Sequence, residues 1–465
     1  MTPLPVATEH ARIRLGAALR RLRSAPTSVR CGRLVRINGL ILEVEGLPLA
    51  LDQRALIRTG EGRTIEACCV SFDHGITHLM ALDADISVGP GALVYPAGTP
   101  ADAGGHFELM ERQRALPIGF SLLGRVVDGF GRPLDGRPAE LSGPPGQGSG
   151  RLNPLRRSQI REPLDVGVRA INGLLTIGRG QRVGIFAGTG VGKSVLLGML
   201  ARRCAADVVV VGLIGERGRE VREFCEDILG PETLQRTVVV VATADSAPLA
   251  RVRGAWFATD VATWFRDQGR HVVLIMDSLT RFAMAQREIA LGLGEPPVSR
   301  GYPPSVFQRL PELVERVGNN EDPNASVTAF YTVLLEGDDS SDPVADSARG
   351  VLDGHILLSR ELAEAGHYPA IDVERSISRV MPKIADAVQL GHAREVKRMF
   401  GRQMRSRDLV AMGAYSPGSD PELDTALRVW PRVSAFLQQG PEDVLDQNAS
   451  LAQLTALGHD IAGRA

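Results

Sequence analysis

A single lysine marks the stretch of this chain whose residue types and spacing could do chemistry. Lys193 lies in the run Ala187-Gly-Thr-Gly-Val-Gly-Lys-Ser194, in a chain where only three of the 53 basic residues are lysine. Since arginine is used almost everywhere else, and its planar guanidinium would substitute poorly here, the lysine indicates a chemical requirement. A compact ammonium followed by a hydroxyl, at the end of a glycine-rich loop, is typical of sites that hold a nucleoside triphosphate and magnesium. The run therefore predicts binding and hydrolysis of ATP.

The loop is expected to bind phosphate mainly through its backbone. Glycines let N–H groups turn toward phosphate oxygens, and the N-terminus of the following helix adds a favourable dipole. Lys193 would contact the β- and γ-phosphates, and Ser194 would bind magnesium. The strict motif begins with glycine where this chain has Ala187, and alanine fits there if its φ is negative. The expected nucleotide-binding residues of the loop are Gly188, Thr189, Gly190, Val191, Gly192, Lys193 and Ser194.

Charged residues follow two other strand-like runs. Asp277 ends the apolar run His271–Met276. A carboxylate at this edge of a parallel sheet commonly holds the metal through water, although it could simply cap the next helix. Glu216 and Arg217, our further candidates for catalysis, follow the run Asp207–Ile214. Glu216 could polarise an attacking water, but a solvated helix start explains the pair equally well.

Apolar runs that alternate with helical patterns fill residues 151–380. Strands buried on both faces show continuous Val, Ile and Leu, because helices cover both sides of the sheet. These runs therefore predict a parallel α/β sheet in a nucleotide-binding domain. The expected strands are Arg182–Ala187, Asp207–Ile214, Thr237–Ala242, His271–Met276 and Val327–Leu335. The stretch 381–465 is expected to form a helical domain interrupted by prolines.

The N-terminal part of the chain has a different character. Residues 26–98 show short β-rich pieces separated by glycine turns, which predicts a small β-barrel. Small barrels often bind single-stranded nucleic acid through aromatics, but this stretch contains only Phe72 and Tyr95, so a structural barrel is favoured. Residues 1–25 predict a basic amphipathic helix, which could be a frayed terminus, a docking helix for a partner or a membrane-surface contact. The Gly- and Pro-rich stretch 99–150 predicts an extended connection.

Composition excludes several classes of protein. No apolar run approaches the ~20 residues that a membrane-spanning helix needs, and the N-terminus lacks the apolar centre of a secretory signal. The formal net charge of −1 gives no overall attraction to nucleic acid or to an anionic membrane. The five cysteines lack metal-ligand spacing, which suits reduced thiols in a cytoplasm.

Several stretches together resemble the catalytic subunits of rotary ATP synthases and, within that superfamily, the type III secretion ATPases. The similarity runs from about residue 30 to residue 445 and implies a P-loop, RecA-like core. Gly413–Asp420 resembles the flagellar protein export ATPases more than their injectisome relatives. The other matching stretches are Leu123–Asp128, Ala187–Ser194, Gly212–Glu220, Leu274–Arg281, Gly301–Phe307, Leu335–Asp339 and His367–Asp372.

The resemblance implies roles at matching positions. Glu216 would orient the hydrolytic water, and Arg281 would lie near the phosphates. Tyr368 would pack on the adenine ring, although a tyrosine before proline could equally be a core residue. Arg379, in the run Ser376–Val380, would be an arginine finger that reaches the γ-phosphate of the neighbouring subunit. Without the resemblance, a surface or salt-bridged arginine is as good an explanation.

The same resemblance implies a magnesium-dependent, protein-transporting ATPase. It would form a homohexameric ring at the cytoplasmic face of a membrane export gate, peripherally associated with the inner face of the membrane. Hydrolysis would be coupled to unfolding or delivery of flagellar export substrates. The N-terminal helix would dock a peripheral stator protein, a central coiled-coil stalk would enter the ring, and the helical domain would contact substrates and chaperones. No nucleic acid partner is expected.

Other functions stay open at this point. An injectisome ATPase or the catalytic subunit of a rotary ATP synthase shares the same motifs. A hexameric RNA translocase is disfavoured by the neutral charge and the few barrel aromatics. A nucleotide-binding assembly subunit without catalysis is the structural alternative. The presence of Glu216 and Arg379 in one chain favours a homo-oligomer, since each subunit then carries both halves of a shared site.

Three more features are interpreted as structural. The acidic run Glu336–Asp342 favours a solvated loop over a second metal site, because it lacks ligand spacing. His355 and His367 are expected to serve the fold. Gly294–Pro304 predicts a stiff loop, which the resemblance would place toward the central channel of the ring.

Overall fold

The computed structural model describes Leu15 and residues 30–60, 63–83, 86–97, 118–138, 154–335 and 342–463. The chain divides into two compact units, Met1–Ala115 and Leu116–Ala465. Apart from Leu15, the helix expected over residues 1–25 lies outside the described residues. The acidic run Glu336–Asp342 also lies outside them except for Asp342, whose carboxylate accepts a hydrogen bond from the N–H of Ala345 at a helix start.

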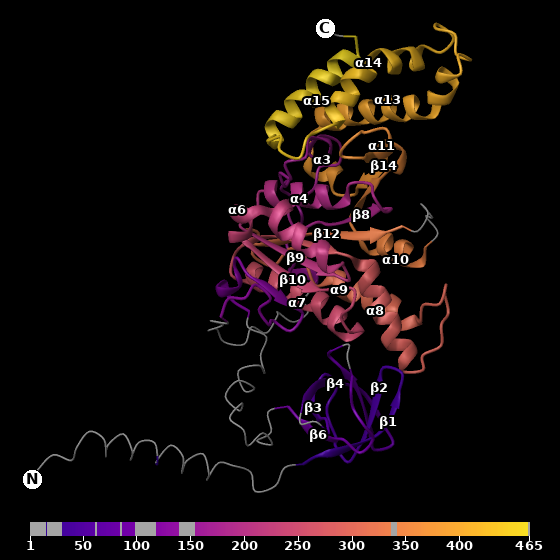
Figure 1. Cartoon of the computed structure of the whole chain (residues 1–465). Coiled ribbons are helices and arrows are strands. Elements are labelled where there is room, and N and C mark those ends of the chain that lie inside the picture. The colour runs from indigo at the N-terminus through magenta and orange to yellow at the C-terminus, as the bar shows by residue number, and fades with distance from the viewer. Residues whose placement is uncertain are drawn as a thin grey trace, which may run out of the picture. The chain divides into compact units, whose positions relative to one another are not determined.

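The first unit contains a closed barrel of antiparallel strands, visible at the indigo end of the chain in Figure 1. Closure leaves no unpaired strand edge, and the interior is filled by apolar side chains such as Leu42, Val44 and Ile57. The small barrel predicted from the sequence is confirmed. Its strands, which pair in the order β1-β2-β5-β4-β3-β6, are β1 (Gly32–Asn38), β2 (Ile41–Glu45), β3 (Arg54–Arg58), β4 (Thr64–Asp73), β5 (Ile76–Ala81) and β6 (Leu93–Pro96).

The second unit is built on an eight-stranded sheet with the order β14-β13-β8-β12-β11-β9-β10-β7. Every neighbouring pair is parallel except β13 and β14, which are antiparallel. The predicted parallel α/β core is confirmed, and each expected strand forms. The strands are β7 (Val126–Asp128), β8 (Arg182–Ala187), β9 (Val208–Ile214), β10 (Thr237–Ala242), β11 (His271–Asp277), β12 (Ser326–Leu334), β13 (Gly354–Leu358) and β14 (Ile371–Ser378).

Strand β7 lies in the stretch where the sequence led us to expect an extended connection. It pairs in parallel with β10 and adds an edge strand to the sheet. A bidentate ion pair between Arg125 and Asp135 holds the turn that follows, and it lowers the pKa of Asp135 to about 2. Residues 118–138 are therefore part of the sheet unit. The sequence analysis missed this strand because three residues are too short a pattern to recognise.

Helices connect consecutive strands of the sheet. Ser278 caps the helix after β11, since its hydroxyl accepts a hydrogen bond from the N–H of Arg281 at 3.1 Å. A π-helical turn, η3 (Phe224–Leu229), continues the short helix that follows β9. The main helices here are α3 (Arg169–Leu174), α4 (Lys193–Arg203), α5 (Gly218–Glu223), α6 (Gly230–Gln235), α7 (Pro248–Asp267), α8 (Leu279–Gly292), α9 (Pro304–Glu315), α10 (Pro343–Val351) and α11 (Arg360–Glu364).

The chain is helical from Met381 on, with α12 (Met381–Ile384), α13 (Ala387–Ala411), α14 (Pro421–Leu437) and α15 (Gln447–Ile461). The last three lie side by side (Figure 1), and aspartates cap their N-termini. They share one hydrophobic core with the sheet. The ring of Phe436 lies 3.0 Å from where a Cβ on Gly173 would be, so α3 and α14 approach closely. This shared core places the helices and the sheet in one compact unit.

Among the residues that the structure describes, no helix combines the length and the apolar character needed to cross a bilayer.

Candidate functional site: a phosphate loop facing a carboxylate pair

The predicted phosphate loop joins β8 to α4. Gly190 and Gly192 have φ values of 79° and 84°, a region that residues with a Cβ rarely adopt. Ala187 is the buried last residue of β8, and its carbonyl accepts a hydrogen bond from Leu335 at 2.9 Å. Its φ is not positive, so the alanine fits where the strict motif has glycine. The loop therefore has the backbone shape that the motif requires.

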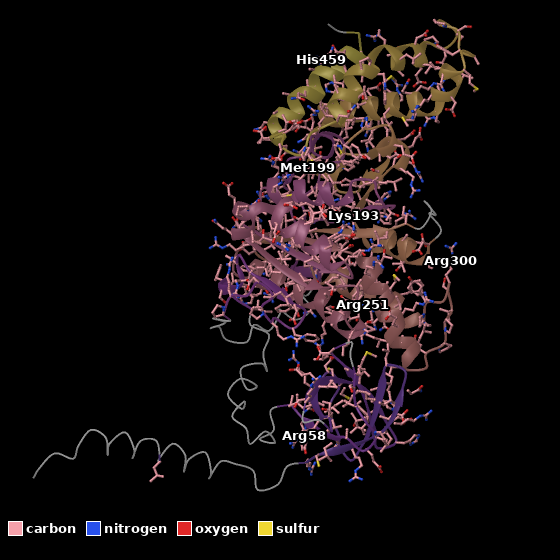
Figure 2. All side chains as sticks on the ribbon, viewed as in Figure 1. Arg58, Lys193, Met199, Arg251, Arg300 and His459 are labelled. Atoms are coloured by element: carbon pink, nitrogen blue, oxygen red, sulfur yellow. The ribbon has the colours of Figure 1, made fainter. Side chains whose placement is uncertain are left out.

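Lys193 connects this loop to two carboxylates from neighbouring strands. Its Nζ lies 2.7 Å from Asp277 Oδ1 and 3.2 Å from Glu216 Oε1. Asp277 is the last residue of β11, and Glu216 follows β9. Asp277 is buried, with its side chain only 4% exposed, and Lys193 and Glu216 are partly buried, at 14% and 13%. Figure 2 shows Lys193 among the side chains of the sheet unit. The fold thus brings together three residues that lie up to 84 positions apart.

Burial governs the protonation of these three groups. Desolvation raises the pKa of Asp277 and of Glu216, and the charge of Lys193 opposes both shifts. The neighbouring carboxyl of Glu220 raises the pKa of Glu216 further. Burial alone would lower the pKa of Lys193, but the charges of Asp277 and Glu216 outweigh it and the pKa is raised. The ammonium therefore stays charged, and Glu216 takes up a proton more readily than an exposed glutamate does.

The order of the strands brings a residue into the site that the sequence analysis missed. Strand β12 lies between β8 and β11, so the loop strand and the Asp277 strand are not neighbours. Thr332, a buried hydroxyl near the C-terminal end of β12, donates a hydrogen bond of 2.6 Å to Asp277 Oδ1. A threonine among apolar residues was the available signal, but only the strand order shows which carboxylate it contacts.

We predict that Thr332→Val lowers the free energy of unfolding of this unit by about 1.5–3 kcal/mol, the usual contribution of a hydrogen bond to a charged group. Urea unfolding followed by tryptophan fluorescence checks this, because Trp256, Trp264 and Trp430 all lie in the second unit. Thr259→Val is the control. It removes a buried bond of 2.8 Å to the neutral carbonyl of Ala255 and should cost about 0.5–1.5 kcal/mol. Equal losses in the two variants would contradict a charged partner for Thr332.

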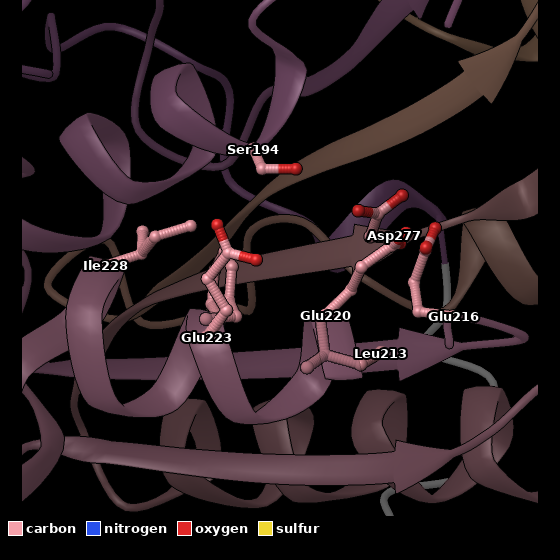
Figure 3. Close-up of a pocket in the computed structure, with 8 residues that line it drawn as sticks. Ser194, Leu213, Glu216, Glu220, Glu223, Ile228 and Asp277 are labelled. Carbon is pink, nitrogen blue, oxygen red and sulfur yellow. The ribbon is translucent and has the colours of Figure 1, made fainter. Parts of the chain in front are cut away.

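A pocket opens beside the carboxylates, lined by Ser194, Leu213, Glu216, Glu220, Glu223, Phe224, Ile228 and Asp277. In Figure 3 the side chains of Ser194, Glu216, Glu220, Glu223 and Asp277 point toward one another across it. The helix α5 and the turn η3 form one wall. Gly198 on α4 lets Ile228 approach, since a Cβ there would lie 2.1 Å from the Ile228 side chain. The sequence analysis gave no role to Glu220 or Glu223, although both follow Glu216 within two helical turns.

Two further candidates pack against glycines of the site. The ring of Tyr368 packs against Gly192, where a Cβ would be 3.1 Å from the ring, and the side chain remains 45% exposed. It is therefore not a core residue. The side chain of Arg281 packs on Gly215, directly before Glu216, and its Nε is buried with no partner in the described part of the chain. An unpaired guanidinium N–H beside the carboxylates suits a bound anion.

Arg379 is not part of this cluster. It follows β14, and its backbone N–H donates to the carbonyl of Asp353, whose own N–H donates to Arg182 at the start of β8. The phosphate loop begins at the opposite end of β8. The two ends, Arg182 and Ala187, are five residue steps apart, or about 17 Å. Arg379 is exposed, and its guanidinium donates to the carbonyl of Arg349 at 3.1 Å.

The remaining candidates have weaker connections to the site. Arg217 is 80% exposed and lies 3.9 Å from Glu220. Thr189 is exposed at the tip of the loop. His355 is half-buried with its Nε2 3.0 Å from the carbonyl of Arg375, and His367 is buried. Burial lowers the pKa of both histidines, so both are neutral near pH 7.

The arrangement suits a magnesium nucleotide. Ser194 and Asp277 offer hard oxygen ligands in one pocket, and Lys193 offers positive charge at the end of the loop. Arg281 offers a second positive charge beside Gly215. The described residues contain no cluster of three or more side chains that could hold a metal alone. That fits magnesium, which proteins usually bind through one or two side chains while phosphates and waters complete its shell.

The geometry defines a class, the P-loop nucleotide-binding proteins in which an extra strand separates the loop strand from the acidic strand. Residues 167–378 match the model of the ATP synthase alpha/beta family, nucleotide-binding domain, and residues 385–456 match the T3SS EscN ATPase C-terminal domain. The chain belongs to the ATP synthase alpha/beta family, in the branch of flagellum-specific ATP synthases and type III secretion ATPases.

Relatives align along almost the whole chain. The flagellum-specific ATP synthase of Salmonella typhimurium is 54% identical over 92% of this chain and 94% of its own length. The assembled ATPase EscN of the enteropathogenic E. coli type III secretion system has a TM-score of 0.81 at 39% identity, covering 92% of this chain and all of EscN. A structure of EscN with its central stalk EscO gives a TM-score of 0.79 at 38% identity, with the same coverage. The family resemblance identified from the motifs is confirmed.

Proposed function

We propose that this chain is a magnesium-dependent ATPase that supplies energy for protein export through a flagellar type III secretion apparatus. One observation carries the catalytic part of the proposal: the Lys193 ammonium lies at the mouth of the phosphate loop, held by Asp277 and Glu216. A buried cation that faces a ring of backbone N–H groups binds phosphate without further rearrangement of the fold. The family match and the 54% identity to a flagellum-specific ATP synthase support the cellular part.

Each residue of the cluster has a distinct role in this proposal. Lys193 would bind the β- and γ-phosphates, and the loop Gly188–Gly192 would surround them with N–H groups. Ser194 and Asp277 would hold magnesium, which offsets negative charge on the phosphates. Glu216 would orient the attacking water and accept its proton, because its raised pKa makes it a stronger base than an exposed glutamate.

The surroundings of the cluster would fix the rest of the nucleotide. Tyr368, exposed beside Gly192, would pack on the adenine ring. Arg281 would donate its unpaired Nε–H toward the phosphates. Arg217 has a long side chain at the start of α5, and we keep it as a candidate for phosphate contact only in an assembled ring.

Arg379 would complete the active site of a neighbouring copy. The whole length of β8 separates it from its own phosphate loop, a distance that no arginine side chain spans. It is exposed and makes no ion pair among the described residues. An exposed guanidinium at the edge strand of the sheet, bonded within the described ranges only to a backbone carbonyl, suits a finger that acts in trans. Such fingers are worth about 10³-fold or more in rate.

Assembly follows from this division of the site. Head-to-tail contact of loop and finger generates a ring when the rotation closes, and we propose a homohexamer. The EscN structures, of an assembled ATPase and of its complex with a central stalk, support self-association and a stalk partner. We place the stalk near the segment Gly294–Pro304. The ring would associate peripherally with the inner face of the cytoplasmic membrane, at the export gate.

The parts of the chain would share the remaining work. The proposed parts are a docking helix at 1–25 for a stator protein, a barrel at 26–98, a connection at 99–150, a nucleotide-binding domain at 151–380 and a helical domain at 381–465. Within the connection, residues 118–138 add the edge strand β7 to the sheet. The helical domain would receive export substrates and chaperones. Nucleic acid is not proposed as a partner, because Phe72 is the one strongly exposed aromatic of the described barrel. An injectisome ATPase is the alternative, and the 39% identity to EscN against 54% to the flagellar relative favours the flagellar system.

Mixing two inactive variants tests the proposal directly. Lys193→Ala removes the phosphate ligand but keeps the finger, and Arg379→Ala does the reverse. Each variant alone should release almost no phosphate from ATP. In a one-to-one mixture, about one quarter of the interfaces combine an intact loop with an intact finger, so about a quarter of the wild-type rate should return. Two inactive variants that stay inactive when mixed, while still assembling, would refute the shared site.

A further inference from the structure

Gln181 and Arg182 lie directly at the start of β8, at the end of the strand that does not carry the phosphate loop. Gln181 is completely buried. Its Oε1 accepts a hydrogen bond of 2.8 Å from the N–H of Gly178, which fixes the direction of the amide. The same amide then donates from Nε2 to the carbonyl of Asp353 at 3.2 Å and to the hydroxyl of Ser378 at 3.1 Å.

These two acceptors flank the residue that we propose as the arginine finger. Ser378 directly precedes Arg379, and the carbonyl of Asp353 accepts the Arg379 N–H at 3.0 Å. The buried amide of Gln181 thus bonds both to the residue that precedes Arg379 and to the carbonyl that accepts the Arg379 N–H. The Ser378 hydroxyl also donates to the carbonyl of Thr176 at 2.9 Å, so the position of this backbone is fixed from two sides.

Arg182 fixes Asp353, the residue whose carbonyl accepts the Arg379 N–H. Its Nε and Nη2 bond to the two carboxylate oxygens of Asp353 at 3.0 and 3.1 Å, and its backbone N–H bonds to Asp353 Oδ2 at 3.0 Å. Nη1 lies 2.6 Å from Glu315 Oε1, at the end of α9. Both carboxylates raise the pKa of Arg182 against the effect of burial, so this arginine is always charged. A bidentate pair with three bonds to one aspartate sets position as well as charge.

From this geometry we infer that Gln181 and Arg182 are positioning residues for Arg379, and that β8 therefore links the two half-sites that one chain contributes. The phosphate loop extends from one end of the strand, and the bonds that hold the finger start at the other. A strand paired on both sides moves as a rigid unit, since β12 and β13 bond along it. The inference rests on the proposed role of Arg379.

The test is a double-mutant cycle on assembled full-length protein. Gln181→Leu should lower kcat about 10- to 100-fold, the effect expected of a displaced catalytic group, with KM for ATP within about twofold of wild type. The affinity for a fluorescent ATP analogue should also be unchanged, because the loop lies at the other end of the strand. In the Arg379→Ala background, Gln181→Leu should lower the rate no further, since a residue that acts through the finger has nothing left to position.

Two further variants keep the test decisive. Ser378→Ala removes the other partner of the same bond and should behave like Gln181→Leu, which covers the case that Gln181→Leu does not fold. Thr259→Val removes an unrelated buried bond in α7 and should leave kcat near wild type. If Gln181→Leu or Ser378→Ala lowers the rate equally in the wild-type and Arg379→Ala backgrounds, the inference is overturned. The shared site would still stand in that case, provided that Arg379→Ala alone is inactive. A wild-type rate for Arg379→Ala alone would overturn both.

Discussion

Arg379→Ala is expected to lower ATP hydrolysis per chain about 10³-fold or more, because the developing charge on the transferred phosphoryl group loses its guanidinium partner. The affinity of the same chain for nucleotide should change little. Arg379 lies by the start of β8, at the opposite end from the phosphate loop of its own chain. The loss should therefore appear in kcat.

Concentration dependence supplies the second measurement for this variant. In wild type, the rate per chain should rise with protein concentration, since a site is complete only when a second copy lends its arginine. In Arg379→Ala the rate should remain low at every concentration. Arg394→Ala, at an exposed arginine of α13, is the matched control and should follow wild type. A wild-type rate that does not depend on concentration, and that Arg379→Ala does not change, would exclude a finger acting between copies.

The second large effect is expected for Glu216→Gln, with a loss of hydrolysis of about 10²- to 10⁴-fold, the range typical of general bases. Glutamine has the same size but does not accept a proton from the water. Nucleotide binding should persist, because Lys193 keeps its contact of 2.7 Å with Asp277. Phosphate release in single turnover, together with binding of a fluorescent ATP analogue, separates the two effects. Glu226→Gln, at an exposed residue that pairs with Arg222, serves as control.

The pH profile gives an independent readout of the same residue. Glu216 must be ionised to act as a base, so kcat/KM should fall as pH drops through its pKa in the free enzyme. Burial, together with the nearby carboxyl of Glu220, raises that pKa, so the acid limb should lie at higher pH than for an exposed glutamate. In Glu216→Gln this limb should disappear from the residual activity. A variant that hydrolyses ATP at the wild-type rate would remove Glu216 from the mechanism.

Much of the fold could be predicted because it depends on local patterns. Continuous apolar runs gave the five central strands, since residues covered on both faces need no polar alternation. Strands β13 and β14 were not predicted, because β14 is an edge strand with alternating exposure and β13 is only five residues long. The helical C-terminal part was expected, but the core that joins it to the sheet was not, since contacts such as Phe436 against Gly173 join residues far apart in the chain.

The candidate site likewise has a part that local sequence predicts and a part that only the tertiary structure decides. Residue order alone was enough for the phosphate loop, because its glycines, lysine and serine act through their own backbone and immediate neighbours. Which side chains meet that loop depends on the order of strands in the sheet. Insertion of β12 between β8 and β11 selects Thr332 as a partner for Asp277, and the path of α5 turns Glu220 and Glu223 into the pocket. The placement of Arg379 by the start of β8 is likewise a consequence of topology. The edge strand β14 runs antiparallel to β13 and returns the chain to the end of the sheet opposite the predicted phosphate loop.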